Sequence, residues 1–269
     1  MLNTEKRNPK TTHIDKMSTL EMVAVIQEEN KNAVAAIDTE LDSIAKAIDA
    51  ITERMAKGGR LFYIGCGTSG RLGVLDASEC PPTYGVPHEC VVGIIAGGDS
   101  ALRRASEGTE DNEEFGRRDL SAFELTKNDS VVGISVAGGA AYVVGALKYA
   151  GEVGAYRVAL TCNAGSRIES LADVAIHPDT GAEVVSGSTR MKAGSSHKMI
   201  LNMISTSVMI KLGHVYENLM INLKPANIKL ERRMLGIVTD ICGCDTDTAK
   251  ALLEANEWNI RRAVEQYKA

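Results

Sequence analysis

The apolar residues of this chain change their spacing several times, and each spacing predicts an element. Ser18 and Glu21 form the Ser-x-x-Glu pattern of a capping box, which predicts that a helix begins after Ser18. From Val34 to Met55 apolar residues recur every three or four positions, which predicts one continuous helix ending at Gly58. Such a stripe packs on its own domain or bridges two subunits, and packing on its own domain is the simpler interpretation.

After Gly58 the pattern becomes a series of short apolar runs that alternate with helix-compatible stretches. Strands that alternate with helices predict crossover connections and a parallel sheet covered on both faces. The predicted strands are 60–64, 90–95, 130–135, 157–161 and 173–176. Because ligands of such sheets bind at the carboxyl ends of the strands, we expect a site in the loops that follow them.

The last third of the chain predicts a helix and a separate small unit. A segment rich in Ser, Gly and Thr, 186–196, leads into an apolar helix over about 197–212, and Pro225 marks a linker. The apolar pattern after it resembles ubiquitin-associated three-helix units, with helices expected at 234–241, 246–255 and 259–267. We therefore expect N-terminal helices (1–57), a main domain (58–223) and a small helical bundle (224–269).

Composition and charge exclude several classes of function. The 269 residues include 30 Lys and Arg against 35 Asp and Glu, a net charge of −5, so nucleic acid is not an expected partner. No apolar run has the length of a membrane span, and the N-terminus lacks the apolar core of a signal peptide. We expect a cytoplasmic protein whose six cysteines are thiols. Cys242 and Cys244 lack a second ligand pair, so no metal site is expected.

The glycine-rich stretch Gly65-Cys-Gly67-Thr-Ser-Gly70 predicts an anion site. It follows a predicted strand and opens a predicted helix, where free backbone amides and the helix N-terminus favour phosphate. The spacing also matches the dinucleotide fingerprint, but the next strand lacks the acidic residue at its end that this fingerprint needs. The hydroxyls of Thr68 and Ser69 favour a compact phosphosugar, and a dinucleotide stays as an alternative. Further hydroxyl and cationic groups lie at Ser188, Thr189, Arg190 and Lys192.

Two acidic regions are candidates for proton transfer. Pro81 and Pro82 are expected to end a helix, which would place Glu79 at its C-terminal edge, where the helix dipole raises a carboxyl pKa. A carboxyl that keeps its proton near neutral pH can act as a general acid. A second acidic cluster, 106–114, contains Glu110 and supplies a base if the fold brings it to the same sugar.

Long stretches of the chain resemble the N-acetylmuramic acid 6-phosphate etherases of bacterial cell-wall recycling. The matching stretches are 4–9, 59–86, 94–98, 107–111, 181–185, 187–194, 218–220 and the final bundle. The resemblance implies a sugar isomerase domain, which is a flavodoxin-like parallel sheet of about five strands with helices on both faces. It also implies a homodimer with sites near the subunit interface, and no metal or cofactor.

The resemblance further implies a reaction and residue roles. Etherases of this family cleave the D-lactyl ether of N-acetylmuramic acid 6-phosphate, giving N-acetylglucosamine 6-phosphate and D-lactate. The ring-opened sugar loses its C2 proton, lactate leaves from C3, and water adds to the unsaturated intermediate. By motif, Glu79 would protonate the departing lactate and Glu110 would take the C2 proton. The implied substrate-binding residues are Gly67, Thr68, Ser69, Ser135, Ser188, Thr189, Arg190 and Lys192.

One loop departs from the family pattern. After 130–135 the family typically carries Ser-Gly-Arg-Thr-Pro-Tyr, whereas this chain reads Ala137-Gly-Gly-Ala-Ala-Tyr142. Each charge-assisted hydrogen bond lost from a phosphate costs about 1.5–3 kcal/mol, which motivates an alternative: a non-catalytic phosphosugar sensor like the regulatory proteins of glucokinase. Both glutamates are retained, which favours the enzyme. His197 replaces an uncharged polar residue of the family, and the chain ends at Ala269, where the family's final helices generally continue.

Overall fold

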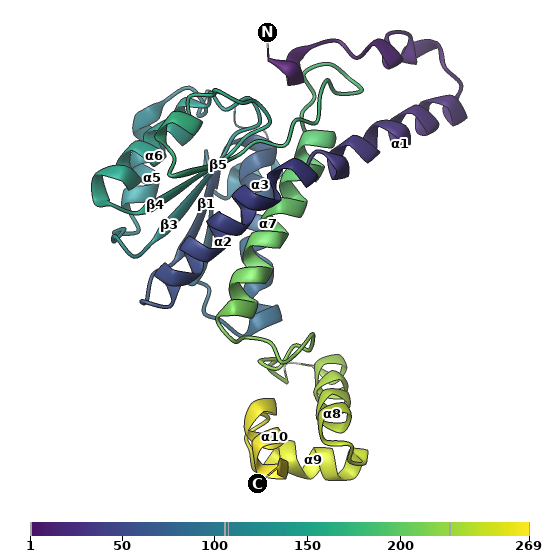
Figure 1. The fold of residues 1–269 in the computed structure, drawn as a ribbon, viewed down its shortest axis with the longest axis vertical. Helices are drawn as coiled ribbons and strands as arrows, with labels where there is room; N and C mark the ends of the chain where they lie inside the picture. The colour runs from purple at the N-terminus through teal and green to yellow at the C-terminus, as the bar shows by residue number, and fades with distance from the viewer. Residues whose placement is uncertain (1, 105, 107, 226, 269) are drawn as a thin grey trace.

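The computed structural model describes residues 2–104, 106, 108–225 and 227–268, and Figure 1 shows its central parallel sheet. The five strands lie in the order β2-β1-β3-β4-β5, and every neighbouring pair is parallel. The strands are β1 (Leu61–Gly65), β2 (Val91–Ile95), β3 (Ser130–Ile134), β4 (Tyr156–Leu160) and β5 (Val174–Ile176). This is the strand order of flavodoxin-like folds, so the predicted five-stranded α/β architecture is confirmed.

Helices cover both faces of this sheet. They are α2 (Leu41–Met55), α3 (Gly67–Tyr84) and α7 (Lys192–Lys211) on one face, and α5 (Glu113–Ser121) and α6 (Ala141–Val153) on the other. Tyr63 packs into the first core and its neighbour Phe62 into the second. Because side chains of a strand alternate between two buried faces, each strand is a continuous apolar run.

The N-terminal region forms an arm and two helices, so the expected continuous helix was wrong. Helix α1 (Thr19–Ala35) begins at the predicted capping box, where Ser18 Oγ accepts from the Glu21 N–H and the Glu21 carboxylate accepts from the Ser18 N–H. A 3-10 turn at Asp38–Glu40 then separates α1 from α2. The break allows α2 to lie along the sheet while α1 projects beyond it (Figure 1).

Helix α3 runs past the two prolines that were expected to end it. Pro81 and Pro82 lie inside the helix, which ends where Gly85 adopts the left-handed conformation at φ 68°. The prolines remove two backbone donors, whereas Tyr84 beyond them is buried in the core, so tertiary packing outweighs the lost bonds. Glu79 therefore lies within the helix and not at its C-terminal edge, and the argument from the helix end does not apply to it.

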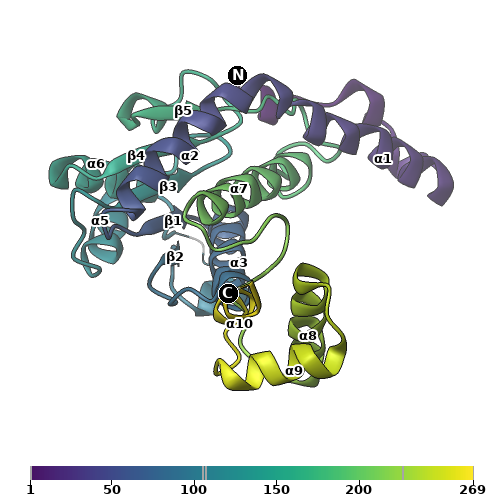
Figure 2. The ribbon, with the colours of Figure 1, turned by 60° about the horizontal axis from the view of Figure 1, so that its bottom comes forward.

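A separate helical unit follows α7 at the opposite end of the molecule from the N-terminus (Figures 1 and 2). It contains α8 (Ile228–Cys242), α9 (Thr246–Ala255) and α10 (Ile260–Lys268), and it has its own apolar core. A one-turn helix, α4 (Ser100–Arg103), completes the set of described α-helices. In the described part of the chain no helix combines the length and apolar character needed to cross a membrane.

Candidate active site

A cavity of about 290 Å³ lies at the carboxyl edge of the sheet, where the site was expected. Six of the predicted site residues line it, namely Gly67, Thr68, Ser69, Glu110, Ser135 and Thr189. Glu79, Ser188, Arg190 and Lys192 do not line it. Glu5 and Cys66 also line the cavity and were not predicted as site residues. The fold thus brings the glycine-rich loop, the acidic loop and the N-terminal arm to one place.

The glycine-rich loop forms the floor of this cavity. Gly67 has φ 52°, a left-handed conformation that favours glycine. A side chain at Gly70 would lie 2.5 Å from the carbonyl oxygen of Gly65, so glycine lets α3 begin directly against the end of β1. No described side chain caps this start of α3, and the hydroxyls of Thr68 and Ser69 lie beside its first amides. Uncapped amides and hydroxyls at a helix N-terminus can bind a phosphate, so the phosphate site predicted here stays a prediction with a suitable geometry.

The altered loop after β3 contributes backbone and methyl groups to the same cavity. Ala137 and Ala140 line it, and the Ser135 hydroxyl accepts a hydrogen bond from the Gly138 N–H at 3.1 Å. Ala140 is the residue before α6, and no described side chain caps that helix either. The start of α3 therefore faces the cavity with free amides, whereas at the start of α6 the Tyr142 N–H donates to the Glu110 carbonyl and the Val143 N–H is left for a capping side chain.

Replacing Ala140 by threonine is expected to stabilise the protein by about 1 kcal/mol, because threonine at a helix N-cap bonds a free amide of the first turn. The φ of −54° and ψ of 115° at Ala140 already suit a capping residue. Urea denaturation of the variant measures the gain. Ala141→Thr, one position inside α6, is the matched control and is expected to give none. An equal gain in the free energy of unfolding for both variants would contradict the explanation by helix capping.

Glu110 is the carboxylate that the acidic cluster contributes to the cavity. Its backbone carbonyl accepts from the Tyr142 N–H at 2.9 Å, which fixes the acidic loop against the start of α6. The nearby Cys66 thiol stays protonated near neutral pH, because burial, with added repulsion from Glu110 and Asp111, raises its pKa to about 12. Glu107 of the same cluster lies outside the described residues. Glu110 is thus a carboxylate beside an uncharged thiol in the cavity, and its role as a base stays a prediction.

Glu79 and Glu110 are not brought together within one chain. Glu79 is exposed on α3, about 18 Å along the helix axis from Gly67 at roughly 1.5 Å per residue. Asp76, one turn before it, is buried and accepts hydrogen bonds from Asn202 and Ser205 of α7. These bonds hold α3 against α7, so Glu79 cannot reach the cavity of its own chain without unpacking the helix.

Two of the predicted ligands lie elsewhere. Lys192 is buried, and its ammonium contacts Glu29 Oε2 of α1 at 2.5 Å. Arg190 lines a neighbouring groove of about 320 Å³, which shares Thr68 with the main cavity. The substrate contacts expected of Lys192 and Arg190 stay predictions, and the structure assigns Lys192 a contact with a carboxylate of the protein itself.

His197 lies on α7 in the core of the domain. Its Nε2 lies 3.4 Å from the Cys162 sulfur, and its Nδ1 has no hydrogen-bond partner among the described residues. Burial lowers the pKa of this imidazole to about 4. His197 is therefore neutral near pH 7 and has a structural position away from the cavity.

The free energy of unfolding is expected to fall as the pH decreases from 6.5 towards 4, because only the unfolded chain lets His197 take up a proton in this range. Above pH 6.5 His197 is neutral in both states and does not lower the free energy of unfolding. Below pH 6.5 the free energy of unfolding falls with a slope that approaches about 1.4 kcal/mol per pH unit. Urea denaturation across this range checks the slope. His197→Asn should lose it and His88→Asn, at an exposed position, should retain it. An unchanged slope in His197→Asn would reject this assignment.

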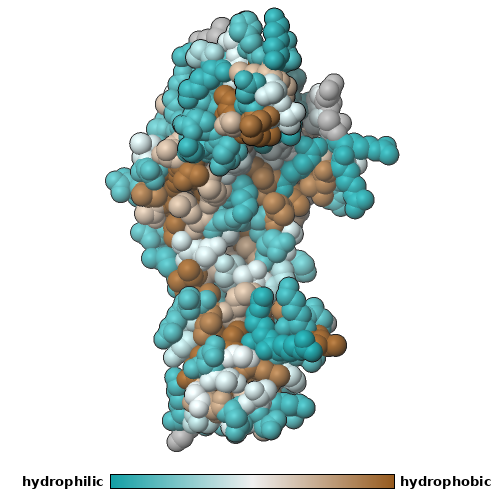
Figure 3. Space-filling model, turned by 90° about the vertical axis from the view of Figure 1, so that its right-hand side faces the viewer, coloured by the Kyte–Doolittle hydropathy of each residue, from teal (hydrophilic) through white to brown (hydrophobic). Residues whose placement is uncertain are grey.

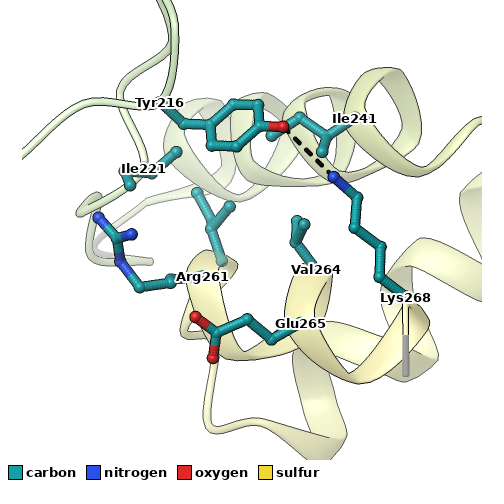
Figure 4. Close-up of a pocket in the computed structure, with 8 residues that line it drawn as sticks. Tyr216, Ile221, Ile241, Arg261, Val264, Glu265 and Lys268 are labelled. Carbon is teal, nitrogen blue, oxygen red and sulfur yellow. Dashed lines mark hydrogen bonds between the residues drawn. The ribbon is translucent and has the colours of Figure 1, made fainter.

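A second cavity, of about 340 Å³, lies in the C-terminal unit and holds none of the predicted site residues (Figure 4). Tyr216 lies across it from α10, and its phenol oxygen accepts from Lys268 Nζ at 3.3 Å. Ile221, Ile241 and Val264 make its lining mostly apolar. It lacks a carboxylate pair, so the cavity at the sheet edge is the candidate active site. In the described parts of the chain no group of three or more His, Cys, Asp or Glu could hold a metal ion.

Comparisons with known proteins identify the family. Over 263 residues the chain is 53% identical to the N-acetylmuramic acid 6-phosphate etherase of Caldanaerobacter subterraneus subsp. tengcongensis, covering 98% of this chain and 86% of that protein. The protein of the same name from Clostridium beijerinckii is 52% identical with the same coverage. This chain belongs to the N-acetylmuramic acid 6-phosphate etherase family. The family predicted from the sequence motifs is confirmed.

Domain families and solved structures agree with the SIS-domain fold of the main domain and with a UBA-like C-terminal unit. Residues 43–151 match the glucokinase regulatory protein N-terminal SIS domain, 109–208 the SIS domain, and 238–267 the UBA-like domain. Phosphoheptose isomerase GmhA from Neisseria gonorrhoeae superimposes with a TM-score of 0.51 at 18% identity, covering 71% of this chain and 98% of that chain. The protein c3406 of E. coli CFT073 gives a TM-score of 0.54 at 17% identity, covering 74% of this chain and 95% of that chain. These two structures show the fold alone.

Proposed function

We propose that this chain is a cytoplasmic carbon-oxygen lyase that cleaves the D-lactyl ether of N-acetylmuramic acid 6-phosphate. The products would be N-acetylglucosamine 6-phosphate and D-lactate. The observation that carries the proposal is the identity of about half of all positions, over nearly the whole chain, with proteins named as etherases for this substrate. The cavity supports it, since the uncapped start of α3 and the carboxylate of Glu110 both line it.

In the proposed reaction the substrate phosphate binds the amides and hydroxyls at Thr68 and Ser69. Glu110 removes the C2 proton of the ring-opened sugar, which is acidic because it lies beside the aldehyde carbon. The electron pair forms the C2–C3 double bond as the C3–O bond breaks. A carboxylic acid protonates the departing lactate oxygen, and water then adds at C3 to give the product. Glu79 is the proposed acid by its motif.

We propose that Glu79 reaches the site from a second copy of the chain in a homodimer. Glu79 is exposed and lies far from the cavity of its own chain, so a symmetric partner can bring it to the other copy's cavity. An apolar groove between α2 and α7 supports association, with Val34, Leu41 and Met203 exposed along it. Figure 3 shows apolar patches on the face of the molecule that carries α1 and α7.

A coupled assay of D-lactate released from N-acetylmuramic acid 6-phosphate tests the reaction. Glu79→Gln and Glu110→Gln should each lose activity when pure. Mixing the two variants under conditions that exchange subunits should restore about one quarter of wild-type activity, because half of the dimers then hold one intact site. No recovery from heterodimers would contradict the shared site. No lactate from the wild-type protein at high concentration would end the enzyme proposal.

A second candidate, a phosphosugar sensor, is favoured by two observations. The loop at 137–141 lacks the family's hydroxyls and Arg, and residues 43–151 match a domain of the glucokinase regulatory protein. A thermal-shift titration with N-acetylglucosamine 6-phosphate discriminates the two functions. Stabilisation by N-acetylglucosamine 6-phosphate, with no lactate released from N-acetylmuramic acid 6-phosphate, would support the sensor. Lactate released from N-acetylmuramic acid 6-phosphate would support the lyase.

A further inference from the structure

The N-terminal arm places a second carboxylate in the candidate active site. Glu5 ends the first 3-10 turn, Asn3–Glu5, and it lines the same cavity as Glu110, Thr68 and Ser69. A side chain added at Gly187 would lie 3.6 Å from Glu5 Oε2, so the carboxylate lies against the segment that precedes α7. Glu5 therefore lines the cavity from the N-terminal arm, beside Gly187.

Buried hydrogen bonds hold this arm at the edge of the sheet. Thr4 is fully buried, and its hydroxyl accepts from the Asn163 side-chain amide at 3.1 Å. The same amide donates to the Val136 carbonyl at 2.9 Å, in the loop after β3. Further along the arm, the Thr11 hydroxyl donates to the Val184 carbonyl at 2.8 Å. The position of Glu5 is thus fixed by the loops that form the cavity and is not that of a free terminus.

The charges around the cavity determine what Glu5 can contact. Among its described lining residues, the carboxylates are Glu5 and Glu110, and no Lys or Arg is present. A phosphate is repelled by these carboxylates and attracted by the helix amides at Thr68 and Ser69. The two carboxylates can instead accept hydrogen bonds, and the hydroxyls of a sugar can donate them.

From this arrangement we infer that Glu5 contacts the substrate and determines specificity, by accepting hydrogen bonds from hydroxyls of the phosphosugar. Glu5 would thereby select the orientation in which the phosphate lies on the floor of the cavity and the sugar chain extends towards Glu110. The inference deepens the proposed function and rests on the same cavity, but it concerns binding and not the proton transfers.

Calorimetric titration with N-acetylglucosamine 6-phosphate tests the contact without requiring turnover. Glu5→Ala is expected to raise the dissociation constant about ten- to hundredfold, since a hydrogen bond to a charged acceptor is lost. Glu28→Gln removes a carboxylate from the exposed face of α1 and is the matched control. A dissociation constant for Glu5→Ala within about twofold of the wild-type value would overturn the inference.

Deoxy analogues separate a substrate contact from a structural role. If Glu5 accepts from the 4-hydroxyl, which substrate and product share, the 4-deoxy analogue of N-acetylglucosamine 6-phosphate should bind wild type about tenfold more weakly than the parent compound. Glu5→Ala should bind that analogue and the parent compound equally. An equal penalty for the 4-deoxy analogue in wild type and variant would show that Glu5 acts only through the fold of the arm, and would reject the contact.

Different results would contradict the placement of Glu5 by the arm and the proposed function. Thr4→Val removes the buried bond to Asn163 while keeping Glu5, so it should weaken binding, and adding Glu5→Ala should then cost less than it does in wild type. Full additivity would contradict delivery of Glu5 by the arm. Wild type that binds the phosphosugar but releases no lactate would remove the lyase and leave the Glu5 contact supported by the same titrations.

Discussion

Glu110→Gln is expected to lower the rate of lactate release by about 10²–10⁴-fold, the usual contribution of a positioned general base. Glutamine keeps the shape of the side chain but accepts no proton at neutral pH. Binding of N-acetylglucosamine 6-phosphate should change by less than about threefold, because the phosphate contacts at Thr68 and Ser69 are untouched. The expected signature is therefore a loss in kcat with little change in affinity.

Proton exchange at C2 identifies which step Glu110 serves. In D₂O the wild-type protein should exchange the C2 hydrogen of the substrate, and Glu110→Gln should lose this exchange together with lactate release. Glu79→Gln should keep the exchange while lactate release falls, since it would protonate the leaving group only. Glu114→Gln, an exposed carboxylate at the start of α5, is the matched control with unchanged activity. Exchange at wild-type rate in Glu110→Gln would assign the base to another group.

The sheet and the phosphate loop could be predicted from the sequence because their signals are local. A strand buried on both faces must be an apolar run, and the structure places each end of the five strands within one residue of the predicted ranges. The loop at Gly65 to Gly70 is equally local, since the φ of Gly67 and the contact between Gly65 and Gly70 each demand glycine.

The elements that were placed wrongly depend on contacts between distant residues. The last long helix of the main domain was expected from about His197, whereas α7 begins at Lys192. The cause is the buried Glu183, whose carboxylate accepts from the N–H groups of Lys192 and Ala193 at 3.1 and 3.0 Å and so replaces a local cap. The prolines of α3 failed as stop signals for a similar reason, because the packing of Tyr84 holds the helix together beyond them.

The site shows the same division between local and distant signals. Thr68 and Ser69 could be predicted from a local motif because their sequence neighbours Cys66 and Gly67 also line the cavity, whereas Glu110 was predicted from the family resemblance. Glu5 was missed, although its motif at 4–9 was recognised, because its place in the cavity depends on the bond between Thr4 and Asn163. Lys192 was predicted to bind the substrate, and that prediction stays untested; in the structure its ammonium contacts the buried carboxylate of Glu29, a distant residue that no local pattern indicates.

Lys192→Met is expected to destabilise the protein by about 3–5 kcal/mol, because it leaves the Glu29 carboxylate buried without its buried partner. Both side chains are nearly inaccessible, with relative exposures of 2% and 3%. Glu29 retains bonds from Asn8 Nδ2 at 2.8 Å and Lys10 Nζ at 3.0 Å, which favours the lower end of that range. Urea denaturation measures the change, and the exposed pair of Lys31 and Glu28 is the matched control, since Lys31→Met should cost less than about 1 kcal/mol.

The double variant Glu29→Met/Lys192→Met separates the ion pair from a substrate contact. Removing both charges should recover most of the stability, because no uncompensated buried charge remains. Burial opposes ionisation of Glu29, but hydrogen bonds from Lys192 and Lys10 outweigh it and lower the pKa to about 2. The contribution of Glu29 is therefore complete above pH 4.5 and is lost as the pH falls towards 2, and the double variant should lose this acid dependence. If the double variant also binds N-acetylglucosamine 6-phosphate as wild type does, Lys192 acts by anchoring α1 to the start of α7. Weakened binding in a fully folded double variant would instead support Lys192 as a substrate ligand.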